Sequence, residues 1–140
     1  MTGLERLLAI RNGEAQAPPL YKLLGITVVA ASAGAATLAL TPSDRQRSPL
    51  GTVGGGVIAT VLDTAAAWAC DTLCPPGKVT TTVDIKVNFL RPVRVDDAAL
   101  TAVAQVVHAG ARIMVATATL GHGDGRPAAI ATATCLVVDA

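Results

Sequence analysis

Aromatic residues are scarce in this sequence. Its 140 residues include one Trp, one Tyr and one Phe, although 51% of all residues are hydrophobic. Most of the apolar side chains are Ala and Val, so a core is available but is built from small groups. The length fits a single domain that spans residues 1–140. Because small side chains bury little surface, we expect the chain to self-associate.

Charged residues are also few, and the two signs balance. There are 11 Lys and Arg against 10 Asp and Glu, which gives a formal net charge of +1. The sequence has no basic run and no aromatic set that could stack on bases, so we expect no nucleic-acid partner. Single arginines remain available for a phosphorylated small molecule.

The three cysteines, Cys70, Cys74 and Cys135, are too few for a disulfide framework, and their number is odd. A metal site would need further ligands, and the two histidines lie far away in the sequence beside glycine-rich turns. We therefore expect the cysteines to be buried as small hydrophobic residues, with no metal bound.

An apolar run long enough to cross a membrane is present only in interrupted form. Val53 to Cys70 is mostly apolar over 18 residues, but glycines open it and Asp63 lies near its middle. Both features are costly in lipid, so the run predicts a buried helix and no membrane partner. The N-terminus lacks the apolar segment of a signal peptide, and we expect a cytoplasmic protein.

Hydrophobic periodicity predicts a helix, two strands, a long helix and four strands. The first helix covers residues 2–12, a linker covers 14–19, and Pro75-Pro76-Gly77 ends the long helix. Strict alternation along residues 82–89 places Val83 and Ile85 on one face and Thr82 on the other. The remaining predicted elements are strands at 23–31, 35–40, 98–108, 113–120 and 128–138, a loop at 42–49, and the long helix at 55–73.

The long helix determines the fold class. It is apolar on every side, so other elements must enclose it. Strands joined by short turns can form a curved antiparallel sheet that wraps around one helix. We therefore predict an α+β fold with one long central helix and a short N-terminal helix.

Asp63 is the only charged residue between Ser48 and Cys70. A buried carboxylate is unfavourable unless it finds donors or changes its pKa, and its position within a helix makes a capping role awkward. We interpret Asp63 as a candidate catalytic acid. The alternative is a structural acid that caps a neighbouring group or pairs with a distant arginine.

Three glycines, Gly54, Gly55 and Gly56, precede this helix. Backbone N–H groups at a helix start lack partners within the helix, and the helix dipole adds partial positive charge there. Without side chains in the way, such a site can hold an oxyanion, for example that of a thioester becoming tetrahedral. A tight turn that requires positive φ is the alternative explanation.

Asp63 and Gly55 are eight residues apart, which corresponds to roughly 12 Å along a helix. This is too far for both residues of one chain to act on the same atom. A site that uses both residues therefore predicts a dimer in which two copies of the helix lie side by side.

Three segments together carry a family resemblance: GGGVIATVLDTAAAWA, TTTVDIKVNFLRPV and VVHAGARIMVATATL. They resemble the hotdog-fold acyl-CoA thioesterases of the phenylacetyl-CoA thioesterase (PaaI-like) group, and the likeness covers nearly the whole chain. The resemblance implies a hotdog fold in which subunits pair by joining their sheets, forming homodimers with composite sites that associate into homotetramers.

The resemblance also implies a reaction and its residues. The acid at Asp63 acts as general base or nucleophile on the thioester, and the N–H of Gly55 from the opposite subunit binds the thioester oxygen. The resemblance implies an acyl-CoA substrate, and the small apolar residues of the chain favour an aryl or medium-chain acyl group without choosing between them. No metal or redox cofactor is implied, since coenzyme A is part of the substrate.

Two positions depart from the family pattern. Ser48 and Gly54 stand where the family has Asn and His, both of which serve the catalytic site. Ser48 can still donate one hydrogen bond, and Thr64 is adjacent to the acid. The departures motivate an alternative, a slow or non-catalytic protein that binds acyl-CoA or another ligand. A purely structural assembly subunit is a third possibility.

The remaining candidates are residues for binding the substrate. Gly56 belongs to the glycine-led helix start, and Asn88 lies near the end of a predicted strand. Arg91 and Arg112 lie at predicted strand ends, where basic residues of the family often meet the phosphates of coenzyme A. Ordinary surface charge is the alternative for both arginines. Trp68 and Cys70 are expected in the core.

Overall fold

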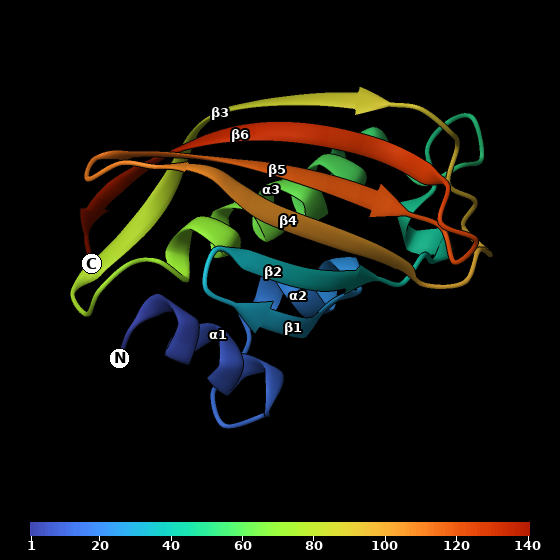
Figure 1. Ribbon diagram of the computed structural model, residues 1–140. Coiled ribbons are helices and arrows are strands. Elements are labelled where there is room, and N and C mark those ends of the chain that lie inside the picture. Colours follow the sequence, from blue (N-terminus) through green and yellow to red (C-terminus); the bar gives the residue numbers. More distant parts are fainter.

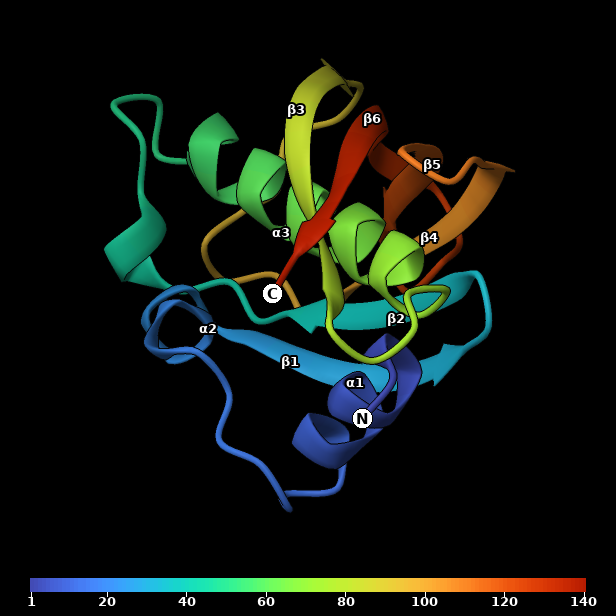
Figure 2. The same ribbon diagram turned by 90° about the vertical axis from the view of Figure 1, so that its left-hand side faces the viewer.

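The computed structural model describes all 140 residues as a curved sheet wrapped around one helix (Figures 1 and 2). The helices are α1 (Gly3–Arg11), α2 (Pro19–Leu24) and α3 (Gly55–Asp71). The strands are β1 (Ile26–Ser32), β2 (Ala35–Leu40), β3 (Lys78–Phe89), β4 (Leu100–Ala109), β5 (Ile113–Gly121) and β6 (Pro127–Asp139). The predicted α+β architecture, with a long central helix and a short N-terminal helix, is confirmed.

The sheet is antiparallel throughout, in the strand order β1-β2-β4-β5-β6-β3. The strands that flank α3 in sequence, β2 and β3, are therefore far apart in the sheet, and β3 lies at one edge. Only β6 pairs with β3, so the other side of this 12-residue strand has no neighbour within the chain.

Helix α3 packs against the concave face of the sheet. Its inner side is fully covered and consists of Ile58, Val61, Leu62, Ala65, Ala66, Ala69 and Cys70. The cover is incomplete, because Asp63, Thr64, Ala67 and Trp68 are only half-buried on the side that faces α2 and the edge strand β3. One stripe of α3 therefore remains accessible.

Helix α2 is absent from the sequence-based prediction. The structure has a helix at Pro19–Leu24 where a linker and the start of a strand were expected, and β1 begins only at Ile26. Pro19 occupies the first helical turn, where its missing N–H is not needed, and Gly25 ends the helix in the left-handed conformation at φ 69°. Two prolines thus start a short helix instead of marking a loop.

Strand β3 also differs from its prediction. It begins at Lys78, and the pairing with β6 shifts between Thr82 and Asp84, which leaves Val83 as a β-bulge. A bulge inserts one residue and reverses the alternation beyond it. Thr82 is therefore half-buried on the same side as Ile85, while Val83 is 57% exposed. The strict alternation predicted for residues 82–89 is wrong at its first two positions.

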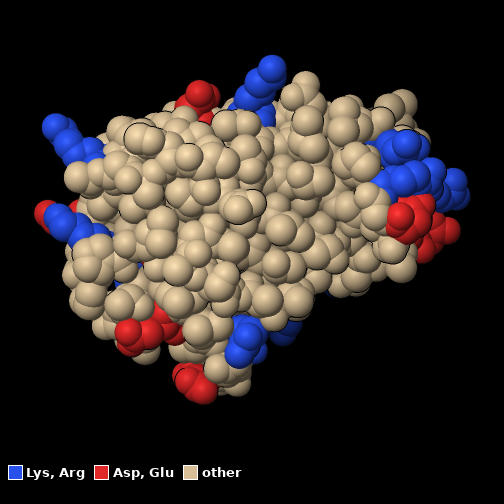
Figure 3. All heavy atoms as spheres, viewed as in Figure 1, with Lys and Arg blue, Asp and Glu red and all other residues tan.

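The outer face of the sheet carries little charge. Figure 3 shows Lys, Arg, Asp and Glu mainly around the margins of this face, with a broad uncharged centre. Exposed side chains on the central strands include Val103, Val107 and Ile130. No helix of the chain combines the length and hydrophobicity needed to cross a membrane.

Candidate functional site

Asp63 contacts strand β3 next to the bulge at Val83. The Thr82 hydroxyl donates a 2.6 Å hydrogen bond to Asp63 Oδ1. No other group of the chain donates to this carboxylate, so Oδ2 is free, and the residue is half-buried. A carboxylate with one anchored and one free oxygen is positioned to accept a proton or a hydrogen bond from a ligand.

Asp71, two helical turns further along the same helix, has a structural role. Its Oδ1 accepts hydrogen bonds from the Thr80 N–H at 2.7 Å and the Thr80 hydroxyl at 2.8 Å. Its Oδ2 pairs with Arg6 Nη2 at 3.3 Å. Both oxygens of Asp71 are therefore engaged, whereas Asp63 keeps one oxygen available.

The free side of Asp63 opens into a cavity of about 270 Å³, which we call the Asp63 cavity. It lies between α2 and the half-buried stripe of α3, and Tyr21 and Trp68 form part of its wall. Trp68 Nε1 donates a hydrogen bond to the Tyr21 hydroxyl. Burial raises the pKa of Tyr21 against the opposing effect of this bond, so the phenol is neutral at ordinary pH.

Thr64 lines the Asp63 cavity beside the acid, but its hydroxyl is already used. It donates a 2.7 Å hydrogen bond to the carbonyl of Thr60, one turn earlier. Such back-bonding satisfies a hydroxyl in the interior of a helix. The hydroxyl that contacts Asp63 is thus that of Thr82, not of its sequence neighbour.

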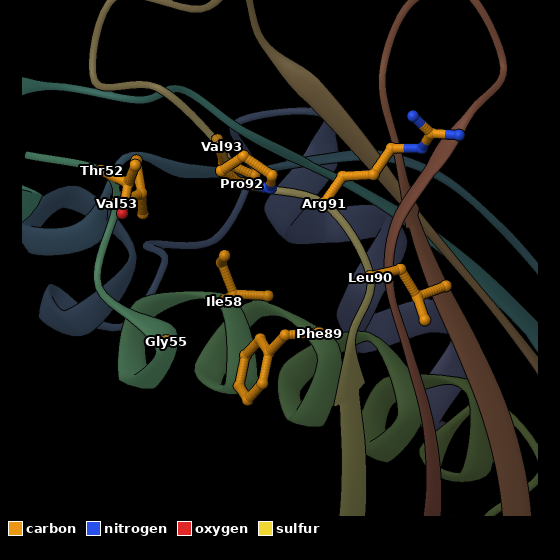
Figure 4. Close-up of a pocket in the computed structure, with 9 residues that line it drawn as sticks. All are labelled: Thr52, Val53, Gly55, Ile58, Phe89, Leu90, Arg91, Pro92 and Val93. Carbon is orange, nitrogen blue, oxygen red and sulfur yellow. The ribbon is translucent and has the colours of Figure 1, made fainter. Parts of the chain in front are cut away.

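The N-terminus of α3 lines a second cavity of about 290 Å³, which we call the Gly55 cavity (Figure 4). The backbone N–H groups of Gly55 and Gly56 have no acceptor within the chain, and both residues are exposed. The Phe89 ring lies over the first turn, 3.2 Å from where a Cβ on Gly55 would stand. Neither glycine has the positive φ that the tight-turn alternative required.

The segment before α3 is fixed by backbone hydrogen bonds. The Gly54 N–H donates to the Gln46 carbonyl at 2.8 Å, and the Val53 N–H donates to the Val93 carbonyl at 2.8 Å. Gln46 is itself buried and donates through Nε2 to the Leu24 carbonyl at 3.0 Å. The donors at the helix start are therefore held in place before any ligand arrives.

The two positions that depart from the family pattern lie in this same segment. Ser48 belongs to a tight turn, where its Oγ is 3.2 Å from Thr52 Oγ1 and accepts from the Leu50 N–H at 3.3 Å. Gly54 is the residue that caps α3, and it supplies no side chain. Neither residue lines the Gly55 cavity or the Asp63 cavity.

The predicted binding residues do not gather in one place. Arg91 lines the Gly55 cavity, although its side chain extends away from the helix (Figure 4). Arg112 precedes β5, at the opposite end of the sheet. Asn88 lies on the outer face with Lys86 and Thr132, so within one chain it is turned away from α3. Only Arg91 and Gly56 lie near Gly55.

Within one chain, Gly55 and Asp63 open into different cavities. The Gly55 cavity and the Asp63 cavity have no lining residue in common. This agrees with the eight-residue spacing along α3, which separates the two groups by roughly 12 Å. We call the acid and the donors, which a single copy of the chain keeps apart, the two candidate half-sites.

The cysteines are all free and buried, as predicted. Two effects raise the pKa of Cys70 and keep this thiol protonated: the larger is its hydrogen bond with Cys135, and the second is burial. No group of three or more His, Cys, Asp or Glu side chains is arranged to hold a metal ion. Trp68, expected in the core, is only half-buried because it faces the Asp63 cavity.

Comparison with known proteins identifies the family. Residues 50–129, more than half of the chain, match the model of the Thioesterase superfamily. The chain belongs to this superfamily. A search among curated proteins returns no match.

Solved structures of similar proteins share the fold over almost their whole length. A thioesterase family protein from Silicibacter pomeroyi is 28% identical with a TM-score of 0.84, covering 96% of this chain and 99% of its own. A phenylacetic acid degradation-related protein from Ralstonia eutropha is 27% identical with a TM-score of 0.84, covering 93% and 98%. The PaaI protein of E. coli, at 23% identity, has a TM-score of 0.85, covering 98% and 96%. The predicted hotdog fold and the resemblance to PaaI-like thioesterases are confirmed.

Three residues of the site were not predicted from the sequence: Thr82, which contacts Asp63, and Tyr21 and Phe89, which line the two cavities. Thr82 was assigned to the wrong face of β3, Tyr21 lies on the unpredicted helix α2, and Phe89 was not selected. One signal was available in the sequence. The only Trp, Tyr and Phe of the chain all line these two cavities.

Proposed function

We propose that the protein is an acyl-CoA thioesterase that hydrolyses a thioester to the free acid and coenzyme A. The observation that carries the proposal is the contrast on α3 between Asp71, whose two oxygens are engaged, and Asp63, whose Oδ2 is free. Membership of the Thioesterase superfamily supports the reaction type.

The chemistry follows from the two half-sites. Asp63 Oδ2 accepts a proton from the water that attacks the thioester carbonyl, while Thr82 holds Oδ1 and fixes the orientation of the carboxylate. The oxyanion that forms is stabilised by the Gly55 N–H at the helix start. Collapse of the tetrahedral species breaks the C–S bond, and the proton returns from Asp63 to the departing sulfur.

This mechanism needs two copies of the chain. Gly55 of one copy and Asp63 of the other must meet, because the two residues of one copy open into separate cavities. The unpaired edge of β3 offers a surface for such pairing, since an antiparallel partner would satisfy its free backbone groups. We propose a homodimer with composite sites, and association of two dimers into a homotetramer.

The acyl group is proposed to be aryl or of medium length. Aromatic and small apolar side chains line the two cavities, which suits a compact apolar group. The name of the Ralstonia eutropha relative, phenylacetic acid degradation-related, supports an aryl group. Coenzyme A enters as part of the substrate, and no further cofactor is needed for this reaction.

The test is hydrolysis of a panel of acyl-CoA thioesters with detection of the released thiol. The three cysteines of the protein are 0 to 1% exposed and add little to the thiol signal of the folded protein. We expect Asp63→Asn to lower kcat at least about 100-fold, since a positioned base contributes this much. Equal slow turnover by both proteins would remove Asp63 from the mechanism.

Asp71→Asn is the matched control, because it makes the same chemical change two turns along the same helix. It weakens the contacts to Arg6 and Thr80 and is expected to lower the melting temperature. The folded fraction should hydrolyse thioesters at close to the wild-type kcat. A comparable loss of kcat in both variants would indicate that the charge of α3, rather than Asp63 itself, matters.

A slow or non-catalytic acyl-CoA-binding protein is the second candidate. It is favoured by Ser48, which is bonded within its own turn, and by Gly54, which has no side chain. A Cβ on Gly54 would be 3.6 Å from its nearest neighbour, so a side chain fits there. A large gain in kcat in the Gly54→His, Ser48→Asn double variant supports this candidate. No gain alongside fast wild-type turnover rejects it.

A further inference from the structure

The Asp63 cavity has a larger neighbour on the other side of helix α2. This third cavity, which we call the α2 groove, has a volume of about 700 Å³ and lies between α2, the start of β1 and Arg45. The two cavities share two wall residues, Pro18 and Tyr21. The Tyr21 residue therefore separates the space beside the candidate catalytic acid from a much larger space.

Tyr21 is fixed in this position. It is 6% exposed and belongs to the main hydrophobic core. Its hydroxyl accepts a hydrogen bond from Trp68 Nε1 on α3, so its outer end is tied to the opposite wall of the Asp63 cavity. Helix α2 is held in turn by Gln46, whose Nε2 donates to the Leu24 carbonyl at 3.0 Å. Tyr21 is therefore a rigid partition between the two cavities.

The α2 groove is suited to an alkyl chain. Ala17, Pro19, Leu23 and Ile26 contribute apolar lining, and Leu23 is 66% exposed with nothing packed over it. Lys22 and Arg45 are also present, and neither forms an ion pair within the chain. An acyl chain that passed Tyr21 would find apolar surface on the far side.

We infer that Tyr21 sets the maximum length of the acyl group by closing the Asp63 cavity against the α2 groove. The inference rests on the proposed acyl-CoA site and makes Tyr21 a specificity-determining residue. Compact acyl groups end against the Tyr21 ring. Longer chains are rejected because the ring blocks the way to the apolar surface of the α2 groove.

Trp68 provides a readout that does not depend on catalysis. It is the only Trp of the chain and lines the Asp63 cavity, so its fluorescence reports occupancy there. The probes are non-hydrolysable S-alkyl-CoA thioethers from ethyl to tetradecyl. For wild type we expect affinity to rise about fourfold per methylene, the gain from burying one CH₂, and then to stop rising at a defined length.

Variants of Tyr21 test whether the ring sets that length. Tyr21→Leu should move the end of the rise to longer alkyl chains. Tyr21→Met, which fills core space flexibly, should do the same if the Leu variant folds poorly. Tyr21→Phe keeps the ring and loses only the hydroxyl, so its length limit should match that of wild type.

The outcomes separate this inference from the proposed function. An unchanged limit in Tyr21→Leu and Tyr21→Met, or no fluorescence response to any thioether, overturns the inference even if thioesters are hydrolysed. If the alkyl-length limit moves in the Tyr21 variants but the protein hydrolyses no thioester, the inference is supported and the proposed function fails. Binding of free coenzyme A is measured in Lys22→Ala and Arg45→Ala as well. If these variants bind coenzyme A more weakly than wild type, its phosphates lie in the α2 groove, and the assignment of this groove to an alkyl chain is overturned.

Discussion

At the scale of single residues, the site depends on which polar groups remain without a partner. Asp63 and Asp71 lie on the same helix face, but only Asp63 has a free carboxylate oxygen. The sequence predicted Asp63 as the candidate acid because it is the only charge in an apolar run. Its partner Thr82 could not be predicted, because strict alternation places it on the wrong side of β3.

Thr82→Val tests the contact between the strand and the acid. The change keeps the shape of the side chain but removes the 2.6 Å hydrogen bond to Asp63 Oδ1. Because a hydrogen bond to a charged group contributes about 1.5–3 kcal/mol, we expect kcat to fall about 10- to 100-fold with KM nearly unchanged. Steady-state kinetics on the best thioester of the panel provides the measurement.

Thr82→Ser is the conservative control, since it retains the hydroxyl and should keep most of the wild-type kcat. A purely structural role for Thr82 predicts a different pattern, in which both variants lower the melting temperature and neither changes kcat. That pattern would show that Thr82 does not position Asp63.

At the scale of elements, the long helix was predictable and its surroundings were less so. Three glycines and Pro75-Pro76-Gly77 bound α3, which ends at Asp71, two residues before its predicted end, and the apolar run between them is long enough only for a helix. Helix α2 was not predicted because its six residues, the first of which is Pro19, carry too little periodicity. The bulge at Val83 escaped because β3 must match β6 in three dimensions, and nothing local marks the inserted residue.

Helix α1 docks on the end of α3 through a close backbone contact at Gly3. The Gly3 N–H donates to the Cys74 carbonyl at 3.1 Å, and a Cβ on Gly3 would lie 1.6 Å from the Asp71 carbonyl oxygen. Gly3→Ala is expected to cost up to about 3 kcal/mol of unfolding free energy, because backbone atoms must move to accommodate the methyl group. Urea denaturation provides the measurement.

Gly56→Ala, on α3, is the matched glycine control for Gly3→Ala. A Cβ there meets nothing within 4 Å, and the residue lies in the first turn of α3. Since Ala favours the helix over Gly, the variant should gain up to about 1 kcal/mol. If Gly3→Ala is as stable as wild type, α1 does not dock as described.

At the scale of the whole molecule, one copy of the chain keeps Gly55 and Asp63 apart. The donors of Gly55 and the carboxylate of Asp63 open into separate cavities, and the edge of β3 is unpaired. The spacing of the two residues along α3 predicted this from the sequence. Pairing through joined sheets was expected only from the family resemblance, because neither charge pattern nor periodicity identifies β3 as the edge strand. The homotetramer stays a prediction.

The composite site can be tested with two variants that each disable one half. Gly55→Pro removes the N–H donor, and proline is tolerated at the first position of a helix. The preceding Gly54 has φ −60° and ψ 139°, a conformation compatible with a following proline. Gly55→Ala keeps the N–H and controls for the contact of the new Cβ with Phe89. Loss of one oxyanion donor should cost about 100- to 1,000-fold in kcat.

The most direct measurement is the activity of a mixed dimer made from Gly55→Pro and Asp63→Asn subunits, co-expressed with different tags and purified through both. If each site takes Gly55 from one subunit and Asp63 from the other, one of the two sites is intact, and the mixed dimer should regain about half of the wild-type activity. Each variant alone should remain inactive. A mixed dimer as inactive as the two parent variants would contradict the account, because it would place Gly55 and Asp63 of each site in the same subunit.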